Sequence, residues 1–233
     1  MYRDEADWVT EFQTRKAFWT HDGDPKRPHI LLNPDYHADG FFDAKLIAED
    51  PGLLNEAASD LVELVQIESS NLINVVDRVV GPALRAGALA HAIALHISQA
   101  RQHNKSATAK RCLVSCTERK NRNDTSESGF TVFKGVGVRP NELVLVTDDV
   151  IVDERKIGLI TSAVTTEYGH VAEFMTTLVN RSGCTVINSS RIVALVNRPI
   201  PVWKASECPL CRQGSWTLEM GGKTSWDLLN SKC

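Results

Sequence analysis

Two adjacent carboxylates follow a short apolar run near the middle of the chain. The run 144–147, Val-Leu-Val-Thr, is typical of a buried strand, and Asp148 and Asp149 are predicted to end it. Carboxylates at the end of a buried strand are costly unless a cation or a hydroxyl group meets them. Such a pair can hold ribose hydroxyls, directly or through Mg²⁺ with its retained waters. The alternative is structural: one Asp caps the next helix and the other is solvated.

Two further segments carry groups that suit anion binding. Arg119, Lys120 and Arg122 place three cations on a polar segment after a predicted strand, where they could clamp a polyphosphate and exclude water. The small residues of 81–87 at a strand-to-helix turn would let backbone N–H groups approach an anion. Each segment has a structural alternative: a solvated run of charges for the first and a tightly packed turn for the second.

Cys208 and Cys211 have the Cys-x-x-Cys spacing of a metal knuckle. A structural zinc ion needs four ligands, and the sequence offers only these two side by side. Cys233, His21 or a second chain would have to supply the others. The alternative is a tight turn that packs two thiols without a metal.

The elements that must position these groups alternate between apolar strands and amphipathic helices. Strands are predicted at 75–80, 111–116, 143–147, 174–179 and 192–196, and helices at 6–19, 55–67, about 82–101 and after 149. This alternation predicts an α/β fold with a parallel-sheet core flanked by helices. Ligands bind beyond the carboxyl ends of such strands, which is where the acidic pair, the small-residue turn and the basic segment all fall.

Composition excludes several classes of protein. The 233 residues include 26 Lys and Arg against 29 Asp and Glu, a formal net charge of −3, which argues against a protein that coats nucleic acid. No apolar stretch is long enough to cross a membrane, and the N-terminus does not read as a signal peptide. Six Cys in a chain of this length do not form a small disulfide framework, so we expect a reduced, cytoplasmic protein.

Together these motifs resemble the type I phosphoribosyltransferases, specifically the orotate phosphoribosyltransferase-like branch, from about His21 to Gly214. Residues 132–149 are similar to the entry into the family's phosphoribosyl diphosphate (PRPP) motif, 81–87 to its pyrophosphate loop, and 119–122 to its basic catalytic loop. Three weaker matches are 40–44, similar to a segment that packs an aromatic ring on the pyrimidine, 180–183, similar to a turn whose Arg pairs with the orotate carboxylate, and 207–214, similar to a C-terminal element frequent in bacterial members.

The resemblance implies transfer of ribose 5-phosphate from PRPP to a pyrimidine-like base such as orotate, with Mg²⁺, in a homodimer and without a side-chain nucleophile. The implied residues are Arg119, Lys120 and Arg122 for catalysis; Asp148, Asp149, Arg155, Lys156, Gly81 and Arg85 for PRPP; Phe41, Phe42 and Arg181 for the base; and Asp148 and Asp149 for Mg²⁺. Membranes and nucleic acids are not expected partners.

The sequence departs from the family pattern at 33–35, at 85–87 and, directly after the acidic pair and its two hydrophobic neighbours, at 152–156. In the family, the acidic pair and two hydrophobic residues are followed by a Thr-Thr-Gly-Gly-Ser/Thr type loop that wraps the 5-phosphate. Here residues 152–156 read Val-Asp-Glu-Arg-Lys, without glycine or threonine. A carboxylate about 4 Å from a phosphate charge costs roughly 4 kcal/mol at an effective dielectric of 20. Either Arg155 and Lys156 bind the phosphate instead, or the chain is a non-catalytic phosphoribosyltransferase-like sensor or subunit that binds a nucleotide or a protein partner.

The same patterns predict the domain organisation. One phosphoribosyltransferase-like domain is expected over 1–214, with a small hood from about 20–50 and part of the C-terminal segment, followed by a tail over 215–233. Residues 33–35, Asn-Pro-Asp, mark a turn within the hood. The stretch after Pro199 shows neither strand nor helix periodicity.

Overall fold

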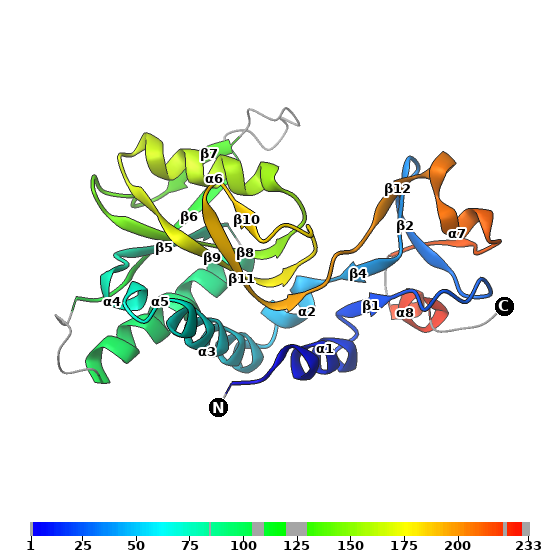
Figure 1. Cartoon of the computed structure of the whole chain (residues 1–233), viewed down its shortest axis with the longest axis horizontal. Coiled ribbons are helices and arrows are strands. Elements are labelled where there is room, and N and C mark those ends of the chain that lie inside the picture. The colour runs from blue at the N-terminus through cyan, green and yellow to red at the C-terminus, as the bar shows by residue number, and fades with distance from the viewer. Residues whose placement is uncertain (1, 84, 104–109, 120–129, 221–222, 230–233) are drawn as a thin grey trace.

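A seven-stranded sheet forms the core of the computed structural model, which describes residues 2–83, 85–103, 110–119, 130–220 and 223–229 (Figure 1). In sheet order the strands are β10 (Val186–Ile187), β11 (Ser190–Asn197), β9 (His170–Asn180), β8 (Leu143–Ile151), β5 (Arg78–Pro82), β6 (Leu113–Arg119) and β7 (Phe130–Lys134). The five inner strands are parallel, and β10 and β7 pair antiparallel at the two edges. The predicted parallel-sheet core is therefore confirmed.

Helices cover both faces of this sheet. The helices are α1 (Glu5–Thr14), α2 (Ala44–Ala48), α3 (Pro51–Glu68), α4 (Leu72–Val75), α5 (Arg85–His103) and α6 (Glu154–Thr166). In Figure 1, α3 and α5 lie below the sheet and α6 lies above it. Each face has its own apolar core, the larger one including Leu61 and Ile93 and the smaller one Ile157 and Ile160. None of the described helices is long and apolar enough to span a bilayer.

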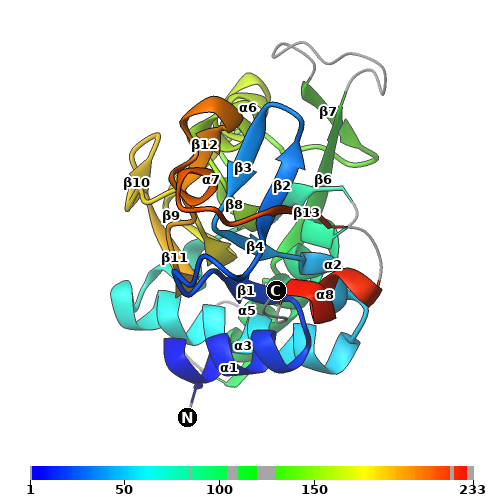
Figure 2. The same ribbon diagram turned by 90° about the vertical axis from the view of Figure 1, so that its right-hand side faces the viewer.

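The hood lies to one side of the core and is built from both ends of the chain (Figures 1 and 2). Its strands are β1 (Phe18–Thr20), β2 (His29–Asn33), β3 (Tyr36–Ala38), β4 (Gly40–Phe42), β12 (Val202–Lys204) and β13 (Thr217–Glu219). β1 pairs with β4, and the other four form a sheet in the order β12-β3-β2-β13. Helices η1 (Ala205–Glu207), α7 (Pro209–Arg212) and α8 (Lys223–Leu229) complete the C-terminal part.

Residues after Pro199 form strands and helices although their sequence shows no strand or helix period. β12 and β13 are three residues long, which is too short for an alternating pattern to emerge from the sequence. β13 lies beyond residue 214 and pairs with β2, so this part of the chain adds a strand to the hood sheet. The domain boundary at 214 stays a prediction.

Two predicted element ends shift, and one predicted turn is confirmed. The first helix ends at Thr14 rather than near residue 19, because Phe18–Thr20 pairs with Gly40–Phe42. The strand expected from residue 75 begins at Arg78, since Leu72–Val75 is helical. The predicted turn at 33–35 is confirmed: it joins β2 to β3, and the Asp35 backbone N–H donates to Asn33 Oδ1 at 2.9 Å.

A buried ion pair, which the apolar pattern did not reveal, ties three segments of the sheet together. Arg78, only 1% exposed, donates from Nε to Glu142 Oε2 at 2.7 Å and from Nη2 to Glu142 Oε1 at 3.1 Å. Its Nη1 donates to Ser115 Oγ at 2.8 Å. Arg78 lies in β5, Ser115 in β6, and Glu142 immediately before β8, so one guanidinium links three neighbouring segments of the sheet.

Candidate active site

The carboxyl ends of β5, β6 and β8 lie side by side, as a parallel sheet requires. Pro82 pairs with Thr117 across β5 and β6, and Val80 pairs with Val146 across β5 and β8. A Cβ at Gly81 would lie 2.7 Å from the carbonyl oxygen of Ala86, so only glycine fits this turn. A Cβ at Gly81 would also lie 3.1 Å from Thr147 Cγ2, so the turn places the start of α5 near the residue of β8 that precedes the acidic pair.

Asp148 and Asp149 lie within β8 and do not end it, which corrects the sequence prediction. The strand continues because Val150 pairs with Val179 and Ile151 with Asn180 on β9. Both carboxylates are consequently buried, with residue exposures of 1% for Asp148 and 6% for Asp149.

The cation that this buried pair needs is Lys156. Its Nζ donates to Asp148 Oδ1 at 2.7 Å and lies 3.7 Å from Asp149 Oδ1. The Asp149 backbone N–H also donates to Asp148 Oδ1, at 3.0 Å. The second carboxylate oxygen, Asp148 Oδ2, is buried and has no hydrogen-bond partner among the described residues. An acceptor oxygen of this kind suits a hydroxyl group or a hydrated Mg²⁺ ion.

Burial raises the pKa of Asp148 to about 7; Lys156 opposes this shift and the neighbouring carboxylate of Asp149 adds to it. The raised pKa follows from the cost of placing a carboxylate charge in a site from which water is excluded. Near neutral pH, Asp148 therefore exchanges between a proton donor and an acceptor.

This shift makes folding stability depend on pH. The folded chain holds the Asp148 proton up to a pKa of about 7, whereas an unfolded chain releases it near 3.8. Between these values the native state binds more protons than the unfolded state, so its free energy of unfolding falls as pH rises, by up to about 1.4 kcal/mol per pH unit. Denaturant titrations at pH 5, 6 and 7 are expected to show a flatter dependence in Asp148→Asn. Equal slopes for the two proteins would contradict the raised pKa.

The segment 152–156, which departs from the family pattern, begins helix α6. Asp153 is the N-cap, and its Oδ1 accepts from the Arg155 backbone N–H at 3.0 Å. The Arg155 guanidinium donates from Nη2 to Asp153 Oδ2 at 2.7 Å, while Lys156 reaches the acidic pair instead. The two predicted phosphate-binding cations therefore point to different carboxylates, one exposed and one buried.

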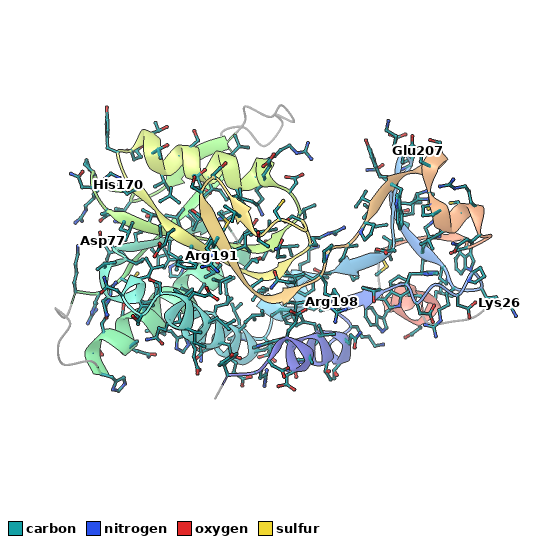
Figure 3. The ribbon with its side chains drawn as sticks, in the orientation of Figure 1. Lys26, Asp77, His170, Arg191, Arg198 and Glu207 are labelled. Carbon is teal, nitrogen blue, oxygen red and sulfur yellow. The ribbon has the colours of Figure 1, made fainter. Side chains whose placement is uncertain are left out.

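Two cavities meet at Val152 and Asp153, which line both of them. The smaller, about 220 Å³, is lined by Phe42, Asp43, Ala44, Asp148, Asp149, Val150, Val152, Asp153 and Lys156. The larger, about 730 Å³, is lined by Leu32, Asn33, Tyr36, Val152, Asp153, Arg155, Arg181, Ser182, Pro199, Ile200, Pro201 and Val202. The core supplies one wall of each cavity and hood residues or residues next to the hood supply another, so the site lies where core and hood meet. Figure 3 labels Arg198 near this junction.

The predicted base-binding residues are divided between these cavities. Phe42 lines the smaller one beside the acidic pair, with its ring 5.1 Å from that of Phe12. Phe41 is partly buried against the apolar core. Arg181 lines the larger cavity, where burial lowers its pKa and Asp39 partly offsets that effect.

The remaining predicted site residues either have a described backbone position or lie outside the described residues. Arg119 is the last residue of β6, and Arg85 is the first residue of α5. Both stand at the same edge of the sheet as the acidic pair. Lys120 and Arg122 lie outside the described residues.

The predicted partners for the Cys-x-x-Cys motif need correction. Within the described residues, Cys208 and Cys211 lie next to His29 and His37 and not next to His21. The ring of His21 instead contacts the backbone of Arg27 and Gly23. Cys233 is outside the described residues. Two histidines on either side of the turn at 33–35 were the signal in the sequence that could have identified these neighbours.

Comparison with known proteins agrees with this architecture. No protein-family model matches the chain. It is 22% identical over 207 residues to a protein from Nitratiruptor sp. named orotate phosphoribosyltransferase, covering 84% of this chain and 91% of that protein. A protein of the same name from Caldicellulosiruptor bescii is 27% identical over 195 residues, covering 84% and 89%.

Among solved structures, orotate phosphoribosyltransferase from Aeropyrum pernix superimposes with a TM-score of 0.55 and 16% sequence identity. The match covers 81% of this chain and 92% of that structure. At this level of identity the likeness establishes the fold, and the resemblance found in the sequence is confirmed.

Proposed function

Because the chain has the type I phosphoribosyltransferase fold and resembles proteins named orotate phosphoribosyltransferase over most of its length, we propose that it transfers ribose 5-phosphate from PRPP to orotate or a similar pyrimidine base. One observation carries the proposal: the buried Asp148–Asp149 pair lines a cavity near the carboxyl ends of the parallel strands. Ligands of parallel α/β folds bind at this edge.

In this proposal the acidic pair orients the ribose. The buried, unpartnered Oδ2 of Asp148 and the carboxylate of Asp149 would accept hydrogen bonds from the ribose hydroxyls. The same carboxylate oxygens would hold Mg²⁺, and the ion would supply positive charge that offsets the charge of the diphosphate. Orientation of the sugar and removal of water from the small cavity lower the barrier to transfer.

The 5-phosphate would be bound by side chains and not by a glycine-rich backbone loop. Arg155 is the better candidate, because its side chain is 72% exposed and its ion pair with Asp153 is an exposed one. Exposed ion pairs contribute only about 0–1 kcal/mol, so Arg155 can exchange Asp153 for a phosphate at small cost. Lys156 is held by the buried Asp148, and moving it would leave that charge uncompensated.

The base would enter the larger cavity beside Arg181. Its guanidinium offers a bidentate partner for the carboxylate of orotate, and Asn33 and Tyr36 supply polar groups on the opposite, hood side. Phe42, which lines the smaller cavity and packs its ring on Phe12 of α1, would form an apolar wall next to the sugar. Gly81 and Arg85 would meet the diphosphate at the neighbouring turn.

Departure of the diphosphate is the step that needs charge stabilisation. We assign it to Arg119, Lys120 and Arg122, because Arg119 ends β6 at the same edge of the sheet as the acidic pair and the other two cations follow it closely in the sequence. A homodimer in the cytoplasm, in which this basic segment serves the partner subunit's site, belongs to the same proposal.

A non-catalytic role is the second candidate, and a specific observation favours it. Lys156 already neutralises Asp148, and Asp153 caps α6 where family members wrap the 5-phosphate. A chain with these contacts could bind a nucleotide or a protein partner without transferring a phosphoribosyl group.

The two candidates are separated by incubating the purified chain with PRPP, Mg²⁺ and orotate. The loss of orotate absorbance and the release of pyrophosphate measure transfer, and the same mixture without PRPP is the control. We expect turnover that depends on both substrates. Nucleotide binding by calorimetry, with no turnover and no heat from millimolar PRPP, would favour the non-catalytic role.

Arg119→Ala is expected to lower kcat by about 10²-fold while the Kd for PRPP changes by less than a factor of about 5. The side chain is assigned to charge that develops as the diphosphate leaves, and loss of one such interaction costs roughly 2.7–4 kcal/mol. Steady-state kinetics and calorimetry measure the two quantities. Equal losses in kcat and affinity would contradict a role in the transition state.

A further inference from the structure

Two histidines and two cysteines converge in the hood, away from the acidic pair. His29 lies in β2, His37 in β3, and Cys208 and Cys211 lie at the start and within α7. One nitrogen or sulfur atom from each residue falls in a group whose members all lie within 4.8 Å of one another. Figure 3 labels Glu207, the residue before Cys208, on the hood and far from the strands of the core.

Four of the distances within this group are close to the edges of a metal-centred tetrahedron. Zinc binds sulfur at about 2.3 Å and histidine nitrogen at about 2.0 Å, which puts neighbouring ligand atoms about 3.3–3.8 Å apart. His29 Nε2 lies 3.4 Å from Cys208 Sγ and 3.5 Å from Cys211 Sγ. His37 Nδ1 lies 3.3 Å from Cys211 Sγ and 3.1 Å from His29 Nε2.

A hydrogen-bond relay behind His29 orients its ring. Ser215 Oγ donates to the backbone carbonyl of Arg27 at 2.6 Å, so the same oxygen accepts from His29 Nδ1 at 2.8 Å. With the proton on Nδ1, the lone pair of Nε2 faces His37 and both sulfurs. Histidines that bind a metal almost always donate their other ring N–H to such a partner.

Burial of three of the four side chains also favours a metal site. His29 is fully buried, Cys208 is 1% exposed and His37 is 7% exposed. Three ligand residues are thus shielded from water, and the four donors have the Cys₂His₂ composition of structural zinc sites. Packed thiols alone would leave the Nε2 lone pair of His29 with only weak donors for partners, apart from His37.

We propose that His29, His37, Cys208 and Cys211 bind one structural zinc ion. All four positions of the tetrahedron come from the protein, so the ion has no open position for a substrate. It would join the β2–β3 hairpin to α7, two segments that are distant in sequence. That hairpin carries Asn33 and Tyr36 to the larger cavity, so the ion would hold one wall of that cavity in place. The inference is independent of the proposed transferase function.

The experiment measures metal content in the purified full chain. The chain is expressed with zinc in the medium, purified in a reducing buffer without chelator, and analysed by mass spectrometry for metals. We expect about one zinc per chain, and less than about a tenth of that in Cys208→Ser/Cys211→Ser. Cys184→Ser is the matched control, since Cys184 is an exposed free cysteine outside the group, and it should keep its zinc.

A second measurement on the unaltered chain keeps the proposal testable if the double variant fails to fold. After chelation, Co²⁺ is titrated into the protein. Tetrahedral ligand-field bands and a thiolate-to-metal charge-transfer band should saturate at one equivalent. A folded, reduced chain that binds neither zinc nor Co²⁺ would overturn the proposal. So would full zinc content in a folded double variant, or a disulfide between the two cysteines in protein kept reduced.

Discussion

Replacing the acidic pair, as Asp148→Asn/Asp149→Asn, is expected to lower kcat/KM for PRPP by about 10²–10⁴-fold. Each carboxylate is assigned a charge-assisted hydrogen bond to the ribose, and loss of such a bond costs about 1.5–3 kcal/mol. Asparagine keeps the shape of both side chains, and the side chain of Lys156 is 39% exposed, so its released ammonium can turn to water. Steady-state kinetics and calorimetry with PRPP and Mg²⁺ measure the effect.

Asp227→Asn is the matched control for this double variant. Asp227 lies in α8 and makes an exposed ion pair with Lys16 at 3.2 Å. It lines neither cavity. Its substitution should leave PRPP binding and turnover unchanged. If the double variant kept its affinity for PRPP within a factor of about 3, the acidic pair would not be the ribose site.

Glu142→Gln is expected to lower the free energy of unfolding by about 3–5 kcal/mol. The change removes the charge that compensates the buried Arg78 guanidinium, and breaking a buried pair from one side strands the other charge. Urea unfolding followed by circular dichroism measures the loss. Glu68→Gln is the control, because its ion pair with Arg191 is exposed and should contribute no more than about 1 kcal/mol.

A second variant separates the cost of the uncompensated Arg78 charge from the net contribution of the ion pair. The double variant Arg78→Met/Glu142→Leu replaces both charges with apolar side chains and is expected to recover most of the stability lost in Glu142→Gln. A loss in Glu142→Gln as small as that in Glu68→Gln would show that the Arg78 charge finds another partner.

The sheet core could be predicted from the sequence because its strands are buried on both faces. Runs such as 143–147 and 174–179 are rich in apolar and β-branched residues, which predicts strands, although each strand is longer than its run. The sequence predicts a strand end at Asp148 and Asp149 because carboxylates are rare inside a sheet. Burial of these carboxylates inside the strand also raises the pKa of Asp148. The strand end that the sequence misplaces therefore lies within the candidate site.

The hood and the contacts across the site could be predicted only in part. Three-residue strands carry no period, and the pairing of β13 with β2 joins residues from opposite ends of the chain. The charge of Lys156 predicts a phosphate ligand, but in the structure its side chain binds Asp148. That contact depends on where α6 begins, and Asp153 sets this position by capping the helix. The sequence does not predict that His29 and His37 lie next to the two cysteines, because only folding brings these distant residues together.

The pairing of Thr217 with His29 has a consequence for biosynthesis. A ribosome releases β2 and β3 long before β12 and β13 emerge, so the nascent hairpin carries two unsatisfied edges while the core is already assembling. Those open edges are templates for pairing with another chain. Shielding of residues 29–38 by a chaperone during translation would therefore protect the protein at its most aggregation-prone stage.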